Sequence, residues 1–197
     1  MASALATSAS APAELDEVSL ARARRGDDGA RRQLIVHYQD RVFRYLWRML
    51  ACRGQGALVE DLCQETFERV LRNVSRFSSG GPARLSTWIL TIATRLALKE
   101  LRRGRVREAA DARADARIDA EPVPGPDRQT ERAALGLAVR SAIAQLSPDH
   151  RAVIVLREYE ELDYDAIARI LDVQIGTVKS RLARARAELR EALDEQR

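Results

Sequence analysis

Apolar residues recur every three or four positions along most of the chain, which is the period of an α-helix buried on one side. Alternating runs of β-branched residues bounded by turn residues, which would indicate strands, do not occur in the sequence. We therefore predict an all-α fold. The helices predicted in the first half span 15–25, from 27 or 28 to 49, 58–74, and from 86 to 103 or 104.

Two further helices are predicted before the last quarter of the chain. The first spans 130–145, and Ser147 followed by Pro148 opens the second. A serine hydroxyl at the N-cap accepts a hydrogen bond from the backbone, and proline suits the first helical position because an N–H there has no partner.

The segment from Asp163 to Glu188 predicts a helix-turn-helix. Asp163 is a suitable N-cap for the first helix, and a tight turn over 172–174 precedes the second. One face of the second helix is apolar, and the opposite face suits the major groove of DNA because it carries cations and small side chains. A solvated amphipathic helix with ordinary surface arginines is the alternative. The apolar face holds Val178, Leu182, Ala185 and Leu189, and the opposite face holds Lys179, Ser180, Ala183 and Arg184, with Arg181 and Arg186 on its flanks.

The distribution of charge favours nucleic acid as a partner. The 197 residues carry a modest net charge of +4 at pH 7. There are seven cations and one anion from Arg84 to Arg107, and five cations and one anion from Gln174 to Arg190. A solvated helix usually mixes both signs for pairing. Each half of the chain is therefore expected to present one basic helix.

A change in composition divides the chain into two predicted domains. Residues 105–128 alternate small and charged side chains before three prolines, so this segment has little to bury and predicts a flexible linker. The predicted domains on either side are 14–104 and 129–197, and the Ala- and Ser-rich residues 1–13 predict a disordered tail.

Several functional classes are disfavoured by what the sequence lacks. It contains no secretory signal and no apolar run of the ~20 residues that span a bilayer, so we expect no membrane insertion. Cys52 and Cys63 lack Cys-x-x-Cys spacing and indicate a reduced, cytoplasmic protein rather than a zinc site. No nucleophile–base–acid set, phosphate-binding glycine loop or metal cluster occurs, so we expect neither an enzyme nor a cofactor.

Three blocks of sequence together resemble the extracytoplasmic-function (ECF) sigma factors of bacterial RNA polymerase. They are DLCQETF at 61–67, STWILTIA at 86–93 continuing to LRR at 101–103, and GTVKSR at 176–181. The resemblance implies a four-helix domain for the −10 promoter element and a helix-turn-helix domain for the −35 element. It also implies promoter melting and transcription initiation as the role, with core RNA polymerase, promoter DNA and an anti-sigma factor as partners.

The first block is implied to bind the polymerase. Its polar residues fall on one side of a helix, and the resemblance implies that they grip a coiled coil of the largest polymerase subunit. A solvated charged helix without a partner is the alternative. The residues concerned are Asp61, Gln64, Glu65 and Glu68.

The second block is implied to bind the −10 element. Trp88, Ile92 and Leu96 are expected in the core, and the loop 77–84 is implied to hold an unstacked base, although a plain connector remains open. The residues assigned to the −10 element are Trp88, Thr91, Thr94, Arg95, Arg102 and Arg103. The chain departs from the family at Leu85, Ser86, Leu90 and Arg95, where an aromatic, an arginine, an aromatic and an asparagine are usual. Aromatic and amide groups suit stacking on unpaired bases and reading them.

The third block is implied to bind the −35 element. Lys179, Ser180 and Arg184 are predicted to contact base edges, and Thr177, Arg181 and Arg186 are predicted to contact phosphates. Arg151 and Tyr164 are weaker phosphate candidates, and Arg157 with Glu158 forms a possible structural ion pair.

Two other functional classes fit parts of the sequence. One is a self-sufficient helix-turn-helix regulator with an N-terminal sensing or dimerisation domain, which would bind duplex DNA tightly without polymerase. The other is a helical adaptor that uses its basic faces for acidic protein partners and does not depend on DNA.

Overall fold

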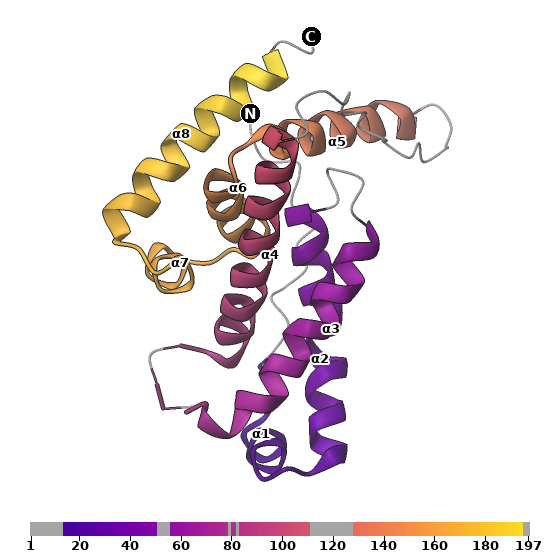
Figure 1. Cartoon of the computed structure of the whole chain (residues 1–197), viewed down its shortest axis with the longest axis vertical. Coiled ribbons are helices and arrows are strands. Elements are labelled where there is room, and N and C mark those ends of the chain that lie inside the picture. Colours follow the sequence, from indigo (N-terminus) through magenta and orange to yellow (C-terminus); the bar gives the residue numbers. More distant parts are fainter. Residues whose placement is uncertain (1–13, 51–55, 79, 82, 111–127, 195–197) are drawn as a thin grey trace.

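The computed structural model of the chain describes residues 14–50, 56–78, 80–81, 83–110 and 128–194. Every regular element in these ranges is helical, which confirms the predicted all-α fold (Figure 1). The α-helices are α1 (Glu17–Arg24), α2 (Asp28–Leu50), α3 (Gly56–Asn73), α4 (Leu85–Ala110), α5 (Arg128–Gln145), α6 (Pro148–Ile154), α7 (Tyr164–Leu171) and α8 (Ile175–Asp194), with a 3-10 turn η2 (Val74–Arg76) and a π-helical turn η3 (Val155–Tyr159).

Side chains cap the helix starts where the sequence predicts them. Ser147 caps α6, with Pro148 in the first turn, and Asp163 caps α7. Each cap satisfies a backbone N–H that has no partner within the helix. The hydrogen bonds run from His150 N to Ser147 Oγ at 3.2 Å, from Ala166 N to Asp163 Oδ1 at 2.6 Å and, at the start of α2, from Ala30 N to Asp27 Oδ1 at 2.7 Å.

The end of α4 differs from the prediction. The helix passes Gly104 and continues to Ala110, so residues 105–110, which were predicted to belong to the linker, are helical. Arginine, glutamate and alanine are strong helix formers, and their run after Gly104 offsets the cost of one glycine in a helix interior. The rest of the predicted linker (111–127), the predicted tail (1–13) and Cys52 lie outside the described residues.

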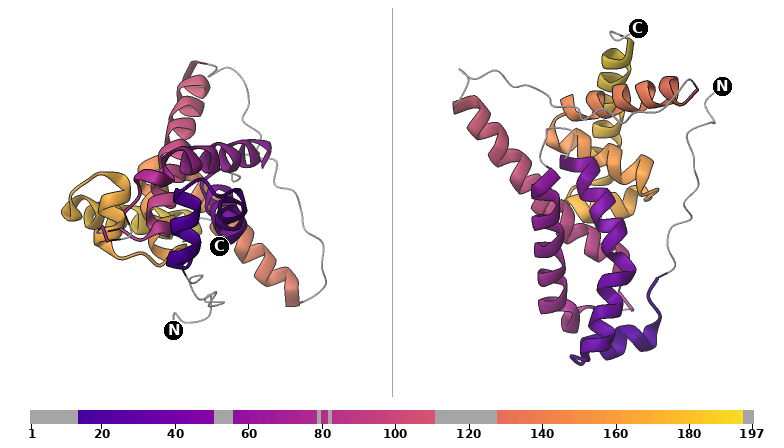
Figure 2. Two further views of the ribbon diagram at one scale, coloured as in Figure 1. Left: turned by 90° about the horizontal axis from the view of Figure 1, so that it is seen from below. Right: turned by 90° about the vertical axis from the view of Figure 1, so that its right-hand side faces the viewer.

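In the first domain, α2, α3 and α4 pack lengthwise against one another, and α1 crosses the beginning of α2 (Figure 2). The core between these helices includes Tyr38, Tyr45 and Ile89, all of which are almost completely buried. Glu14 ties the N-terminal end of the domain to α4, because its carboxylate accepts hydrogen bonds from Tyr38 Oη at 2.9 Å and from the Ser86 backbone N–H at 3.2 Å.

In the second domain, α7 and α8 form the predicted helix-turn-helix, and α6 packs against α8. The turn depends on Asp172, which adopts a left-handed backbone conformation with φ of 56° and ends α7. Val178, Leu182 and Ala185 are buried as predicted, and Leu189 is half-buried. The opposite side of α8 therefore faces outward.

The two domains pack against each other. Helix α4 lies between α2 and α3 of its own domain and α6 and α7 of the second domain (Figure 1). Buried residues from both domains form one continuous apolar cluster, from Leu20 in α1 to Ala185 in α8. No helix in the described ranges is both long and apolar enough to cross a membrane.

Candidate nucleic-acid interface

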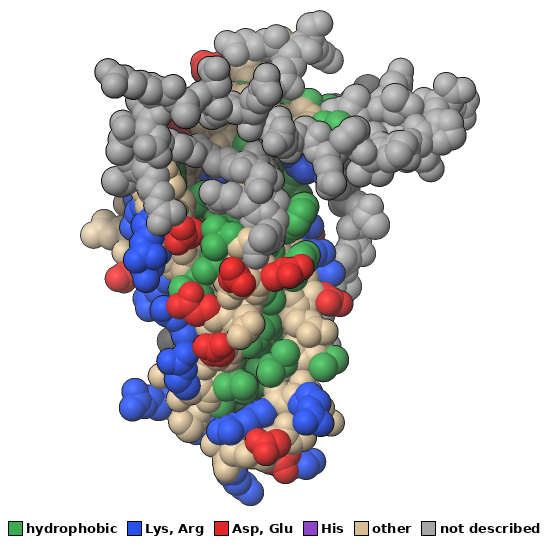
Figure 3. Space-filling model, turned by 45° about the vertical axis from the view of Figure 1, so that its right-hand side comes forward, with side chains coloured by type: hydrophobic (Ala, Val, Ile, Leu, Met, Phe, Trp, Pro, Cys, Tyr) green, Lys and Arg blue, Asp and Glu red, His purple; other side chains and the backbone are tan. Residues whose placement is uncertain are grey.

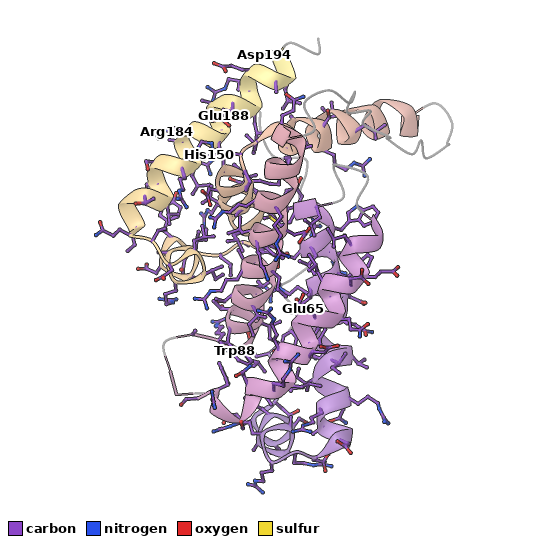
Figure 4. The ribbon with its side chains drawn as sticks, in the orientation of Figure 1. Glu65, Trp88, His150, Arg184, Glu188 and Asp194 are labelled. Atoms are coloured by element: carbon purple, nitrogen blue, oxygen red, sulfur yellow. The ribbon has the colours of Figure 1, made fainter. Side chains whose placement is uncertain are left out.

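The outward face of α8 carries the three residues predicted to contact bases. Lys179, Ser180 and Arg184 are exposed, and Thr177 in the first turn is half-buried. The helix is held from its inner side by α6, where His150 Nδ1 lies 2.9 Å from Glu188 Oε1 (Figure 4). The outward face is thus presented on a helix whose position is set by packing.

The flanking arginines of α8 are engaged in ion pairs within the second domain. Arg186 Nη2 lies 2.7 Å from Glu158 Oε1, and this hydrogen bond raises the pKa of the Arg186 guanidinium. Arg181 Nη2 lies 3.8 Å from Asp149 Oδ2. The predicted pairing of Arg157 with Glu158 is wrong, since Arg157 instead donates to the carbonyl of Leu162 at 2.8 Å.

Arg151 does not face DNA, so its prediction as a phosphate contact is wrong. Its side chain is only 1% exposed and donates to the backbone carbonyls of Met49 at 2.8 Å and Ile143 at 3.1 Å, as well as to those of Ala144 and Leu146. Met49 lies near the end of α2 and the other three carbonyls lie around the end of α5. The cation therefore satisfies carbonyl groups at two helix C-termini, which carry partial negative charge.

Tyr164 is half-buried at the start of α7. The Arg157 guanidinium lies 5.2 Å from the centre of its ring and Lys179 Nζ lies 6.0 Å from it. Both cations therefore lie at cation–π distance from the ring.

The exposed side of α4 carries part of the predicted −10 set. Arg95 is exposed and Thr91 is half-buried, with its hydroxyl donating to the Thr87 carbonyl at 2.8 Å. Arg102 and Arg103 are exposed and lie 3.1 Å from Asp149 Oδ1 and 3.7 Å from Glu100 Oε2, respectively.

Thr94 is the clear exception in this set, and its prediction as a DNA contact is wrong. The residue is fully buried, and its hydroxyl hydrogen-bonds to the Leu90 carbonyl at 2.6 Å and to Tyr45 Oη at 2.7 Å. Position 94 faces α2, and other helices cover α4 on more than one side. The helical period of α4 alone therefore does not indicate which of its positions are exposed to solvent.

A groove of about 590 Å³ lies between the end of α3 and the start of α4. Trp88 packs against Phe77 along it, with ring centres 5.3 Å apart and planes inclined by 39°. Trp88 and Ile92 are half-buried at this groove, whereas Leu96 is buried as predicted. The complete lining is Glu65, Arg69, Arg72, Asn73, Arg76, Phe77, Trp88, Ile92 and Arg95.

The α3 wall of this groove was not predicted from the sequence. Arg69 and Arg72 of α3 and Arg76 of η2 recur at intervals of three and four, so the same helical period that identifies buried faces would have placed them on one side of this segment. Aromatic rings beside several cations are the combination that binds a single nucleic-acid strand, because the rings stack on bases and the cations attract phosphates.

The adjoining strip of α3 carries the residues predicted to bind the polymerase, and Glu65 also lines the α3–α4 groove. Asp61, Gln64 and Glu68 are exposed and Glu65 is half-buried. Three side-chain contacts follow the helix, joining Gln64 Nε2 to Glu68 Oε1 at 3.1 Å, Glu65 Oε1 to Arg69 Nη2 at 2.6 Å and Glu68 Oε2 to Arg72 Nη2 at 3.2 Å.

An apolar groove of about 440 Å³ between α2 and α3 lies beside these polar residues. Its apolar lining is Ile35, Phe43, Cys63, Phe67 and Leu71. Figure 3 shows the strip of hydrophobic side chains on this side of the molecule, with acidic side chains next to it. Exposed Trp47 stacks on exposed Phe43 with ring centres 6.1 Å apart. These two aromatic residues lie outside the apolar stripe of α2 that was predicted to be buried. Their position outside that stripe was a signal in the sequence for a partner surface.

Comparison with known proteins identifies the family. Residues 34–107 match Sigma-70 region 2 and residues 136–189 match Sigma-70, region 4, so the two domains are those of a sigma-70-type protein. The chain is 31% identical to the RNA polymerase sigma-H factor of Pseudomonas aeruginosa, covering 91% of this chain and 94% of that protein. It is 30% identical to the ECF RNA polymerase sigma factor SigW of Bacillus subtilis, covering 86% and 92%. The chain belongs to the ECF RNA polymerase sigma factors.

A further relative is longer than this chain. The chain is 37% identical to the ECF RNA polymerase sigma factor SigE of Mycolicibacterium smegmatis over 162 residues, which are 82% of this chain and 60% of that protein.

The fold is also similar to solved structures. The sigma factor RpoE in its complex with the anti-sigma factor NepR from Bartonella quintana superimposes with a TM-score of 0.63 at 25% identity, covering 84% of this chain and 98% of that chain. CnrH in complex with the cytosolic domain of CnrY shares the fold, with a TM-score of 0.62 at 21% identity, covering 92% and 99%.

Proposed function

We propose that this sigma factor binds core RNA polymerase, recognises the −35 and −10 elements of its promoters, and promotes promoter melting and transcription initiation. The observation that carries the proposal is the pairing, in one chain, of a helix-turn-helix with an outward basic face and a cation-lined aromatic groove, in the two parts that match sigma-70 regions 4 and 2. Catalysis belongs to the core enzyme. The protein would act in the cytoplasm, where that enzyme is found.

We assign the −35 element to α8. Lys179, Ser180 and Arg184 would contact base edges in the major groove, and the flanking residues Thr177, Arg181 and Arg186 would contact phosphates. Phosphate would replace Asp149 as the partner of Arg181 and Glu158 as the partner of Arg186, so no cation needs to be left without an anion.

We assign the −10 element to the outer side of α4 and to the α3–α4 groove. Trp88 would stack on an unpaired base, Arg95 would contact it or its phosphate, and Thr91, Arg102 and Arg103 would contact the strand along α4. Stacking on an aromatic side chain contributes roughly 1–3 kcal/mol per base. That is comparable with the few kcal/mol needed to expel a base from the duplex, so such a groove favours melting.

We assign polymerase binding to the α2–α3 side of the molecule. Asp61, Gln64, Glu65 and Glu68 supply a polar rim, and the adjacent apolar groove would accept the hydrophobic face of a helical coiled coil. Helix-in-groove binding needs this combination, because the groove provides buried area and the rim provides orientation. The solved relatives RpoE and CnrH are described in complexes with NepR and CnrY, and we propose that an anti-sigma factor regulates this protein too.

In vitro transcription with purified core polymerase and a library of promoter fragments tests the proposal. Initiation should require the sigma factor and should select a two-part sequence. Absence of any selective, core-dependent initiation, with folded protein and active core, would overturn it. Tight and specific duplex binding without core polymerase would indicate a self-sufficient regulator instead.

A further inference from the structure

The first residue of α8 is an apolar side chain on the outside of the molecule. Ile175 is 40% exposed, and within the described ranges it belongs neither to the apolar cluster nor to the half-buried side chains packed against that cluster. Val173, two positions earlier, packs against the cluster, and Val178, three positions later, is fully buried. The chain therefore directs Ile175 away from the core between two valines that face it.

Helix formation does not account for an isoleucine at this position either. A β-branched side chain loses rotamer freedom in a helix, which lowers its helix propensity. Acidic residues suit the positive end of a helix, and α6 and α7 carry Asp149 and Asp165 in their first turns. The first turn of α8 has no acidic residue. This turn therefore holds no anion that would repel the phosphates of DNA.

Ile175 lies on the side of α8 that is assigned to the −35 element. Lys179 lies one helical turn further along, at a spacing of four, and both side chains are exposed. Figure 1 shows the start of α8 at the outer edge of the molecule, next to α7. In a helix-turn-helix, the N-terminal residues of the second helix are those that contact base edges. Ile175 is therefore placed where a base contact is expected.

The next residue leaves the backbone of this turn uncovered. Gly176 is exposed, and no atom of the described chain outside its own helical turn lies within 4 Å of the point that a β-carbon would occupy. Its backbone does not have a positive φ, so neither packing nor backbone conformation requires glycine, and alanine would form helix more readily. The missing side chain instead allows a neighbouring molecule to approach the first turn of α8 closely.

We propose that Ile175 determines specificity for a thymine in the −35 element, by packing against the 5-methyl group of that base in the major groove. The inference rests on the proposed function, since it places α8 on the −35 element. Among the four bases, only thymine presents a methyl group in the major groove, and apolar side chains are suited to contact it. Isoleucine forms no side-chain hydrogen bond, so the donors and acceptors of other base edges offer it no comparable contact.

The geometry of α8 also places the thymine relative to a neighbouring contact. Ile175 and Lys179 are separated by about 6 Å along the helix axis, because each residue adds about 1.5 Å. Successive base pairs are separated by about 3.4 Å, so the thymine lies within about two base pairs of the base that Lys179 contacts. The two side chains would thus recognise different chemical features of adjacent positions.

Deoxyuridine tests the contact directly, because it differs from thymidine only in lacking the 5-methyl group. The probe is a promoter duplex selected from the fragment library by full-length protein with core polymerase. Each thymine of its −35 element is replaced in turn, on either strand, and competition binding to the same holoenzyme gives the affinities. With wild-type protein, one replacement should weaken binding about fourfold, which is the loss expected from one buried methyl group.

Three variants show whether Ile175 is responsible for that response. Ile175→Ala should bind the selected promoter about fourfold or more weakly and should no longer respond to that deoxyuridine. Ile175→Val keeps a branched apolar side chain and should retain the response. Leu137→Ala truncates another exposed apolar side chain of the second domain and should respond as wild type does. Because Ile175 is exposed, its replacement should leave the fold intact, which circular dichroism checks.

Selective initiation by wild type without a response to any deoxyuridine, or with an equal response in Ile175→Ala, would overturn the inference and leave the proposed function intact. A selected −35 element without thymine on either strand would do the same. If no form of the protein initiates selectively with core polymerase, the proposed function is contradicted. Duplexes are then selected by binding to the protein alone, and the same substitutions decide. A methyl response that depends on Ile175 supports the contact, and its absence overturns it.

Discussion

Tyr45 of α2 and Thr94 of α4 join their hydroxyl groups at 2.7 Å inside the first domain. Both side chains are fully buried, and burial holds the pKa of the Tyr45 hydroxyl well above its ordinary value. Tyr45 is therefore neutral at any pH at which the protein works. The Thr94 hydroxyl also bonds to the Leu90 carbonyl at 2.6 Å, so the pair anchors the middle of α4 on α2.

Thr94→Val should lower the free energy of unfolding by roughly 1–3 kcal/mol, because it leaves the buried Tyr45 hydroxyl without its partner. Urea denaturation measures this loss. Adding Tyr45→Phe should recover part of it, since the unsatisfied group is then removed as well. Promoter binding by folded Thr94→Val protein should match that of wild type. Altered −10 preference at unchanged stability would show that position 94 contacts DNA after all.

Arg184→Ala and Arg186→Ala should affect −35 binding in different ways. Loss of Arg184, on the outward face, should cost about 1–3 kcal/mol and relax preference at one base position. Loss of Arg186, on the flank, should weaken binding nearly equally on all sequences and reduce the salt slope by about one. Competition binding on a set of −35 variants at several salt concentrations separates the two effects. Equal and sequence-independent losses would refute this division of α8.

Trp88→Ala should reduce open-complex formation by a factor of about 5 to 150, which corresponds to one lost stacking contact of roughly 1–3 kcal/mol. Binding to a duplex −35 fragment should not change, because Trp88 lies in the other domain. Permanganate reactivity of unpaired thymines reports the opening. Trp88→Phe retains an aromatic face and serves as the matched control. If Trp88→Phe and Trp88→Ala lose equal activity at equal stability, stacking is not the role of Trp88.

Glu68→Lys should weaken binding to core polymerase about tenfold and slow association, because it reverses a charge on the polar rim of the apolar groove. Glu191→Lys, at the exposed end of α8, changes the net charge by the same amount and should leave core binding unaltered. Fluorescence anisotropy of labelled protein titrated with core polymerase gives both affinities. Similar losses in the two variants would mean that the effect is nonspecific and that this face of α3 is not the docking surface.

The helix-turn-helix was predictable from the sequence because its determinants are local. Asp163 as cap, the turn after Leu171 and the apolar stripe of α8 all act within about 25 residues and fix both helices and the outward face. The polar positions of α3 that were predicted to bind the polymerase also form one surface, because their spacing within a single helix is a local property.

The errors arose where burial depends on distant elements. Thr94 and Arg95 are neighbours, yet one is fully buried and the other exposed, because α4 is covered by helices of both domains. Arg151 resembled a surface cation, but one carbonyl that receives its hydrogen bonds belongs to Met49, 102 positions away. The apolar groove likewise exists only because α2 lies alongside α3, which the period of either helix does not specify.

The position of α4 between the two domains constrains how this protein can evolve. Its outer side is assigned to promoter contacts, and its other sides pack against helices of both domains. A substitution on α4 therefore affects two properties, the contacts proposed for promoter DNA and the packing of the second domain. Lineages that acquire new target genes through this helix would also alter how the domains pack, so promoter choice and domain packing would be inherited together.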